Sequence, residues 1–313
     1  MNMNTSPIEL NHVTKTYGDF KAVDDISFTV PEGTVCGFLG PNGAGKTTSI
    51  RMMLDILRPS SGTISILGAR RALDVRSRIG YLPEEKGLYK KMTATAMIAY
   101  FATLKGVAGG EAKRIAGELL EKYGLGSFQN HKCEALSKGM GQKVQVLASI
   151  AHDPDLVILD EPFSGLDPVN QGVMEEVIQD IRSRGKTILF STHVMSHAER
   201  ICERVVIMAA GRLAFDGTVD EAKSLLPRRV RVKGKGAGAA LEQLKDVTHS
   251  SPSSDGREGV AEFQLREGAD PQQLLKCAFE QNISLEIFEV VNPNLHEVFV
   301  HLVGEEAREA AYR

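Results

Sequence analysis

The chain has 313 residues, of which 42 % are apolar, and this predicts about two domains, each with a hydrophobic core. The formal net charge of −3 gives no general attraction to nucleic acid or to an anionic membrane. The four cysteines lack the paired spacing of a metal or redox motif, which favours a reducing compartment. No apolar run approaches the length of a membrane span, and residues 1–7 lack the features of a secretory signal. We therefore expect a cytosolic chain unless a partner holds it at a membrane.

The N-terminal part of the chain predicts strands on either side of a glycine-rich loop. Apolar and polar residues alternate over 8–13, and a second strand over 23–30 stops at Pro31. A buried strand follows at 35–39, a turn and short strand are predicted over 62–68, and a strand that runs into a loop is predicted over 79–85. Tyr17 lies upstream of the loop. A lone tyrosine in such a segment is more often a packing residue, but its ring could also stack on a nucleotide base.

The glycine-rich loop has the pattern G-x-x-x-x-G-K-[ST] between a strand and a helix that starts at about Thr47. Glycines let consecutive backbone N–H groups approach an anion, and the positive end of the helix dipole adds to the attraction. Lys46 would reach the outer phosphates, and the Thr47 hydroxyl would bind Mg²⁺, which prefers oxygen ligands. The pattern predicts a nucleotide phosphate site formed by Gly40, Pro41, Asn42, Gly43, Ala44, Gly45, Lys46, Thr47 and Thr48.

Residues 92–151 change to a helical pattern, which predicts an insert that starts with two amphipathic helices. A further helix opens at residues 136–142, with Ser137 as a candidate N-cap. Gly139 and Gly141 lie in its first turn, where each glycine costs up to roughly 1 kcal/mol relative to alanine. A bare helix N-terminus that an anion approaches would explain this cost.

Two further apolar runs are followed by residues with ionisable side chains, which are candidates for binding or catalysis. The run 156–159 ends in Asp160 and Glu161, and the run 187–191 is followed by His193. Continuous apolar runs are typical of strands buried on both faces of a parallel sheet, and ligands of open α/β sheets bind at the carboxyl ends of such strands. We therefore expect these three side chains to lie at the edge that carries Gly40. An amphipathic helix is predicted over 173–181, a last strand over 205–208, and a hairpin at Gly211.

The sequence changes in texture from about Pro227. Alternating and helical patterns predict the order βαββαβ of a ferredoxin-like domain, with helices over 239–244 and 274–279 and a polar loop over 250–259. Asn294 and Glu297 have the spacing of a capping box, which predicts a last short helix. This segment contains no constellation of catalytic groups.

Over residues 8–220 the order and spacing of these motifs resemble the ATP-binding subunit of an ATP-binding cassette (ABC) transporter. Residues 80–89 are similar to those of single-cassette subunits of ABC-2 type exporters, and residues 294–300 resemble the end of a small C-terminal domain found in some members. The resemblance implies an α/β fold: a P-loop NTPase cassette over 1–226, with a mixed sheet core, an antiparallel β subdomain and a helical subdomain. A small α+β ferredoxin-like accessory domain would cover 227–313.

The resemblance also implies a sandwich dimer with two composite ATP sites. ATP would lie between the Lys46 loop of one subunit and the helix start of its twin, which contributes Ser137 and Gly139. Asp167 would link the two sites, and Tyr17 would stack on adenine. Catalysis would use Lys46, Glu161 as the acceptor of a proton from water, and His193. Mg²⁺ would be held by Thr47, Asp160 and Glu84.

Two departures from the family pattern stand out. Glu84 occupies the place of a glutamine, and a carboxylate only accepts hydrogen bonds and adds negative charge near the metal. We expect Glu84 to be tolerated and to tune hydrolysis. Lys138, Met140 and Gly141 replace a glycine, a glutamine and a polar residue.

The partners implied by the resemblance are an integral-membrane permease and a second ATP-binding subunit, identical or different, at the cytoplasmic face of the cell membrane. No nucleic-acid partner is expected. The alternative is a soluble ABC ATPase that acts as a mechanical switch on ribosomes or DNA. Ribosome-acting members usually carry two cassettes and DNA-repair members long heptad arms, and this chain has neither. A small-molecule kinase would not need the Ser137 motif, and a GTPase would need an Asn-Lys-x-Asp motif that is absent.

Overall fold

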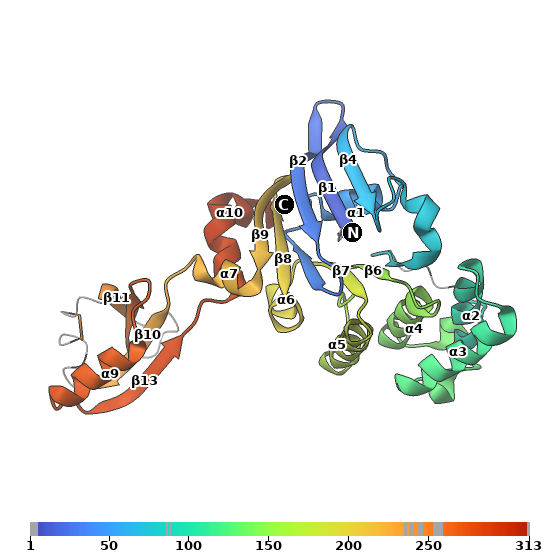
Figure 1. Cartoon of the computed structure of the whole chain (residues 1–313). Helices are drawn as coiled ribbons and strands as arrows, with labels where there is room; N and C mark the ends of the chain where they lie inside the picture. The colour runs from blue at the N-terminus through green and yellow to red at the C-terminus, as the bar shows by residue number, and fades with distance from the viewer. Residues whose placement is uncertain are drawn as a thin grey trace, which may run out of the picture. The chain divides into compact units, whose positions relative to one another are not determined.

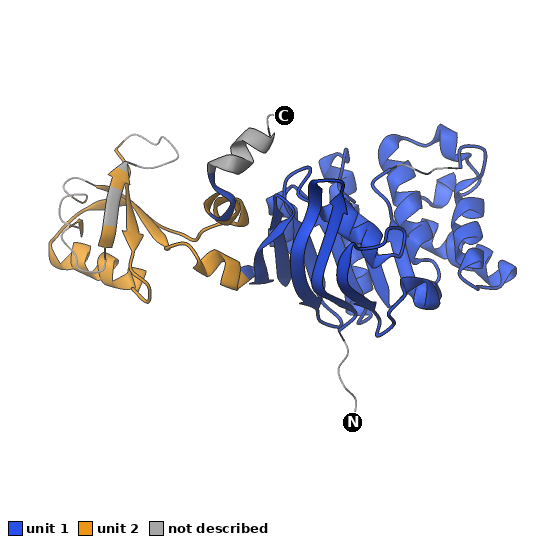
Figure 2. Cartoon of the chain, turned by 90° about the horizontal axis from the view of Figure 1, so that it is seen from above, with its two compact units in different colours: residues 1–219, 302–313 blue, residues 220–301 orange. Residues whose placement is uncertain are grey.

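The computed structural model describes residues 6–311, apart from 86, 88, 235–236, 238–240, 243–246 and 253–258. The chain divides into two compact units (Figures 1 and 2). The first, here called the cassette, comprises residues 1–219 and 302–313, and the second, the accessory unit, comprises residues 220–301. The boundary predicted after residue 226 lies a few residues beyond this division. In the part of the chain that the structure describes, none of the helices combines the length and apolar character needed to cross a bilayer.

An antiparallel sheet forms one layer of the cassette. It consists of β1 (Ile8–Tyr17), β2 (Phe20–Val30) and β4 (Ser61–Ile66), in the order β2-β1-β4. The predicted strands are confirmed, and the first two are longer than predicted. They meet in a tight hairpin whose turn contains Gly18 at a φ of 58°, a conformation that glycine adopts without strain.

The second layer is a six-stranded sheet in the order β5-β6-β7-β3-β8-β9. All of its strand pairs are parallel except β8 with β9, so the sheet is mixed, as predicted. Every residue of β3, β6 and β7 is buried, which explains the continuous apolar runs in the sequence. The strands are β3 (Val35–Leu39), β5 (Ile79–Leu82), β6 (Leu156–Asp160), β7 (Thr187–Thr192), β8 (Arg204–Ala209) and β9 (Arg212–Thr218).

Helices complete the layers of the cassette. The short helix α1 (Lys46–Met53) shares one core cluster with residues of both sheets, among them Ile8, Phe28 and Phe38. Helices α4 (Lys138–Ile150), α5 (Pro168–Ser183) and α6 (Met195–Ile201) lie on the other side of the six-stranded sheet (Figure 1). The apolar pattern after the loop extends to Leu57, but α1 ends at Met53 because Asp55 has a left-handed φ of 57°.

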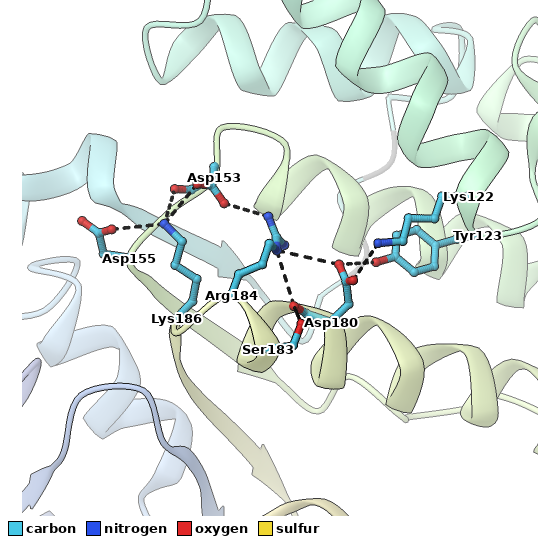
Figure 3. A network of polar contacts seen from close by, with 8 residues as sticks. All are labelled: Lys122, Tyr123, Asp153, Asp155, Asp180, Ser183, Arg184 and Lys186. Carbon is cyan, nitrogen blue, oxygen red and sulfur yellow. Dashed lines mark hydrogen bonds and ion pairs between the residues drawn. The ribbon is translucent and has the colours of Figure 1, made fainter.

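The helical insert contains α2 (Ala94–Leu104) and α3 (Gly109–Lys122), as predicted, and packs on α4. Polar contacts tie it to the sheet layer (Figure 3). Asp180 on α5 accepts hydrogen bonds from Lys122 Nζ at 2.6 Å and Tyr123 Oη at 3.0 Å. Arg184 and Lys186 extend this network to Asp153 and Asp155, in the turn before β6. Three short 3₁₀ segments connect the elements: Ala72–Arg78, Gly126–Phe128 and Cys133–Ala135.

The described strands and the helix α9 of the accessory unit follow the ferredoxin-like order predicted from the sequence. Its sheet is antiparallel, in the order β11-β12-β10-β13, and Val230, Phe263 and Leu274 lie in its core. The helix predicted over 239–244 lies largely outside the described residues, and the predicted loop is a strand up to Pro252. The described elements are β10 (Arg229–Gly234), β11 (Val247–Pro252), β12 (Ala261–Leu265), α9 (Pro271–Glu280) and β13 (Leu285–Val291).

The chain ends in α10 (Leu295–Ala311), which is longer than the predicted short helix and kinks at Gly304; α7 (Val219–Ser224) precedes β10. Half of the predicted capping box forms, because Asn294 Oδ1 accepts from the Glu297 backbone N–H at 2.9 Å. The Glu297 carboxylate instead accepts two 2.7 Å hydrogen bonds from Arg229. This ion pair fixes the start of α10 to β10.

Candidate functional site

The carboxyl ends of three neighbouring strands meet at one edge of the cassette sheet. Leu39 of β3 is in register with Thr192 of β7, and Asp160 of β6 with Ser191 of β7. Because these strands are parallel, the polar groups that follow them emerge at the same edge. The structure thus brings the glycine-rich loop and Glu161 to one place, with His193 beside Glu161.

The loop backbone depends on glycine at two positions. A Cβ atom on Gly40 would collide with the Met208 carbonyl oxygen, and one on Gly45 would lie 2.6 Å from the Ala22 carbonyl oxygen. Gly45 also has a φ of 99° and forms the N-cap of α1 without any side-chain hydrogen bond. The first N–H groups of α1 therefore have no capping side chain, which suits an anion-binding helix start.

A cavity of about 370 Å³ lies over this loop. Its lining combines backbone amides and hydroxyls with one cation and two carboxylates. The lining residues are 42–48 of the loop together with Phe20, Ala22, Glu84 and Glu161. This set of groups matches the phosphates of a nucleotide and the water that attacks them.

The Lys46 side chain is the cation of this cavity and is only 6 % exposed. Its Nζ donates to the carbonyl oxygens of Gly40 at 2.7 Å and Pro41 at 3.1 Å. Burial lowers the pKa of Lys46, and the nearby carboxylates of Glu161, Asp160 and Glu84 oppose this shift. The ammonium is thus held next to the negative charges among which a phosphate would lie.

Asp160 is 1 % exposed and is a natural metal ligand. One carboxylate oxygen accepts from the Ser191 hydroxyl, and Oδ2 has no partner within the described part of the chain. In that same part, no three His, Cys, Asp or Glu side chains form a metal-binding group by themselves. Mg²⁺ suits this arrangement, because it usually takes one or two carboxylates and completes its shell with substrate phosphates and water. The residues present therefore fit Mg²⁺ held by Asp160 and the cavity residues Thr47 and Glu84.

Glu161 is held in an unusual backbone conformation. Its φ is 51°, in the left-handed region that residues with a Cβ rarely adopt. Its N–H donates to Ser191 Oγ at 3.0 Å, and its Oε1 lies 3.0 Å from His193 Nδ1. The side chain lines the cavity and is 8 % exposed. A carboxylate so placed can accept a proton, and the imidazole can fix its orientation.

Three further predicted residues, Ser137, Gly139 and Asp167, are not among the lining residues of the cavity. Ser137 caps α4, its Oγ accepting from the Met140 N–H at 3.3 Å, and Asp167 caps α5 by accepting from the Asn170 N–H at 2.9 Å. Gly139 is buried against Asn170, because a Cβ there would lie 2.6 Å from the Asn170 Nδ2 atom. This contact within the chain gives a reason for Gly139 that the sequence did not suggest.

Sequence reasoning missed two residues of the cavity, Phe20 and Ala22. Tyr17 is not among the lining residues; its half-exposed ring has the Lys15 Nζ atom 5.2 Å from its centroid. Phe20 pairs with Tyr17 across the hairpin and is 65 % exposed. An exposed aromatic residue three positions after Tyr17 was a signal for a second candidate base platform.

An apolar groove of about 510 Å³ lies next to the segment that carries Glu84. It is formed where the end of β5 meets α2 and α4. Its lining includes three aromatic side chains, Tyr81, Tyr89 and Phe101, together with Leu82, Pro83 and Met97.

The chain matches known proteins along almost its whole length. Family models described as ABC transporter and as the C-terminal domain of DrrA1-3-like ATP-binding proteins match residues 23–164 and 217–303. An uncharacterized ABC transporter ATP-binding protein of Bacillus subtilis (strain 168), YhaQ, is 38 % identical over 95 % of this chain and 98 % of its own length. The daunorubicin resistance ATP-binding protein DrrA3 of Streptomyces coeruleorubidus is 32 % identical over 98 % of each chain.

A solved structure of an ATP-binding cassette is also similar to this chain. The ATP-binding cassette MJ0796, in its dimeric post-hydrolysis state with ADP and phosphate, is 25 % identical with a TM-score of 0.63, over 67 % of this chain and 98 % of that one. The predicted resemblance is confirmed. Because the geometry of the nucleotide-binding edge and the similarity to these relatives agree, the chain belongs to the ATP-binding subunits of ABC transporters and is an ATPase of that family.

Proposed function

We propose that the chain is the motor subunit of an ABC-2 type exporter, a peripheral protein at the cytoplasmic face of the cell membrane. The relative DrrA3 is named for drug resistance, and the match to the C-terminal model of its group extends over the accessory unit. The alternative role on ribosomes or DNA has no support among these relatives. The observation that carries the proposal is the cavity in which Lys46, Thr47, Glu84 and Glu161 converge.

The residues of the cavity divide the work of hydrolysis. The loop amides and Lys46 bind the phosphates, and Glu161 accepts a proton from the attacking water. His193 holds the Glu161 carboxylate in place through the 3.0 Å contact. Mg²⁺ bound by Thr47, Asp160 and Glu84 would supply charge neutralisation at the phosphates.

The second half of each ATP site would come from a twin subunit. Ser137 and Gly139 would present the N-terminus of α4 to the nucleotide held by the partner's loop, and Asp167 would link the two sites. The dimeric state of the MJ0796 cassette supports this reading. In this scheme ATP closes the dimer and hydrolysis opens it.

The apolar groove beside Glu84 is the proposed seat of the permease. Its aromatic lining and its position next to the cavity would let a permease segment sense the nucleotide. Phe101 lines the groove, and its ring packs against the rings of Tyr89 and Tyr100.

The test is purification of the tagged chain from detergent-solubilised membranes of its own cell. We expect a multi-span membrane protein to co-purify and to be lost in Phe101→Glu, whose isolated ATPase activity remains. Ile56→Glu is the matched control, because Ile56 is 61 % exposed and lies outside the groove. A chain that sediments with ribosomes and never with membranes would contradict the proposal.

A further inference from the structure

A buried hydrogen bond joins the helix α4 to the segment that carries Glu161. Gln142, on the second turn of α4, is 6 % exposed, and its Nε2 donates to the carbonyl oxygen of Pro162 at 2.7 Å. Pro162 is also buried and directly follows Glu161. The helix that begins at Ser137 is therefore tied to the peptide next to the proton acceptor.

Gln142 is a poor choice for this place if stability alone mattered. Its second amide atom, Oε1, is buried without a hydrogen-bond partner in the described part of the chain. A buried acceptor without a donor is unfavourable, and such exceptions in native proteins call for a functional explanation. Here the Nε2 donor reaches the carbonyl of the residue that follows Glu161.

Two further contacts pack the start of α4 against the segment that follows Glu161. Gly139 is in contact with Asn170, whose amide Nδ2 donates to Asp167 at 2.6 Å. The Lys138 ammonium lies directly over Gly165, in the turn that connects Glu161 to Asp167. A displacement of the α4 start is thus transmitted to this turn by direct contact.

The Glu161 conformation needs support on both sides. A non-glycine residue at a φ of 51° is strained and persists only where its surroundings hold it. Ser191 holds the Glu161 N–H, and Gln142 holds the Pro162 carbonyl that follows. Without Gln142, one of these two supports is lost and the carboxylate can leave the position in which it meets the attacking water.

We propose that Gln142 is a positioning residue for hydrolysis. Through its hydrogen bond to Pro162 it fixes the position of the Glu161 carboxylate, and it makes that position depend on where the start of α4 lies. The proposal rests on the proposed function, in which the α4 start contacts the nucleotide of the twin subunit. Occupancy of one site would then adjust the proton acceptor of the other. The coupling runs within one chain, from the α4 start to Glu161.

The test compares Gln142→Met with Gln171→Met in the full-length chain. Methionine keeps the length and approximate volume of glutamine but cannot donate, so a role in packing alone would survive the change. Gln171 is the matched control, because its Nε2 donates at 3.2 Å to the Leu166 carbonyl in the same turn, but from α5. Gln142→Glu is a second variant of the same size, which decides the question if Gln142→Met fails to fold.

For Gln142→Met we expect kcat to fall by about 10-fold to 100-fold, the range that a small misplacement of a catalytic group produces. The KM for ATP should stay within about 2-fold, because the phosphate loop is untouched. The Hill coefficient for ATP should fall towards 1. Binding of a non-hydrolysable ATP analogue and the thermal midpoint, both near wild type, show that the variant is folded. Gln171→Met should keep the wild-type kcat and Hill coefficient.

Wild-type kcat and Hill coefficient in a folded Gln142→Met chain would overturn the proposal. So would a loss of kcat of equal size in Gln171→Met. A wild-type chain that hydrolyses ATP without dimer formation, while Gln142→Met still loses kcat, would contradict the composite-site part of the proposed function. That result would leave the link between Gln142 and Glu161 supported.

Discussion

The cassette and the accessory unit treat buried polar groups in opposite ways. In the accessory unit, Glu262 is 5 % exposed and pairs with Arg231 at 2.7 Å and Arg229 at 3.4 Å. In the cassette, Asp160 Oδ2 and Gln142 Oε1 are buried without partners, and every such orphan atom among the described residues lies in this unit. Native proteins satisfy most buried polar groups internally. Asp160 and Gln142 of the cassette thus keep acceptor atoms that a ligand or a rearrangement could satisfy, whereas Glu262 of the accessory unit has its partners within that unit.

The largest expected effect comes from Glu161→Gln in the cassette. Removing a general base lowers turnover by about 10²-fold to 10⁴-fold, while ATP should still bind and dimers accumulate because the bound nucleotide is not consumed. Phosphate release and gel filtration with ATP measure the two effects. Glu118→Gln, at a side chain on α3 that is 62 % exposed, is the control and should leave turnover unchanged. Undiminished turnover in Glu161→Gln would refute the assignment of the site.

The converse is expected in the accessory unit, where Glu262→Gln should reduce stability rather than turnover. The change removes one carboxylate from the half-buried Arg229 and Arg231 side chains, which keep Glu297 and Glu289 as partners. The loss of charged hydrogen bonds of this kind costs about 1.5 to 3 kcal/mol. Urea unfolding measures the loss. Glu286→Gln removes the exposed pair with Lys233 and should cost less than about 1 kcal/mol. Equal costs would mean that burial does not strengthen the Glu262 pairs.

Glu262→Gln also tests whether the accessory unit regulates hydrolysis or supports dimerisation. Turnover per folded dimer should then change together with the urea midpoint. Wild-type turnover and dimerisation, in a variant whose accessory unit is unfolded, would remove both roles.

A smaller effect is expected at His152, whose half-buried ring should make the stability of the cassette depend on pH. Burial, aided by the Lys105 ammonium, lowers the pKa of His152 to about 4, and its Nδ1 has no partner among the described residues. The unfolded chain binds the proton near pH 6.5 and the folded chain only near pH 4. This residue therefore stabilises the fold above about pH 6.5, and that contribution is lost as the pH falls towards 4. Urea midpoints of His152→Gln should depend less on pH in this window; an unchanged slope would refute the assignment.

The smallest effect is expected for Glu84→Gln, which removes one negative charge beside the proposed metal position. The half-saturating Mg²⁺ concentration for ATPase activity should rise by about 3-fold, the size expected for one partly screened charge. Titration of turnover with Mg²⁺ measures this change. Identical rate and Mg²⁺ dependence in wild type and variant would show that Glu84 does not tune hydrolysis.

Those parts of the fold that are encoded locally were predictable. The runs before Gly40, Asp160 and His193 are apolar because their strands are covered on both faces, and parallel pairing then brings the three strand ends to one edge. In the accessory unit, alternating and helical patterns predicted the described strands and the helix α9. The sequence also predicted that Ser137 caps its helix, because capping is a contact over three residues.

Contacts between distant segments were not predictable in this way. Phe20 reaches the cavity through the hairpin it forms with Tyr17, and the sequence pattern does not specify that geometry. The bond from Gln142 to Pro162 and the contact of Gly139 with Asn170 depend on how α4 and α5 pack together. The apolar pattern does not mark the end of α1, because Leu54 and Leu57 still pack against the core beyond the last helical turn.

The contact of Gly139 with Asn170 changes how mutants of residues 136–142 should be interpreted. An alanine there displaces the Asn170 amide, which also bonds to Asp167, so lost activity would mix a local steric fault with a lost phosphate contact. The Ser137 side chain is exposed and caps its own helix turn, so its replacement alters far less of the subunit's interior. Complementation between a Ser137 variant and a Lys46 variant in mixed dimers would therefore count the composite sites more cleanly than any change at the glycine.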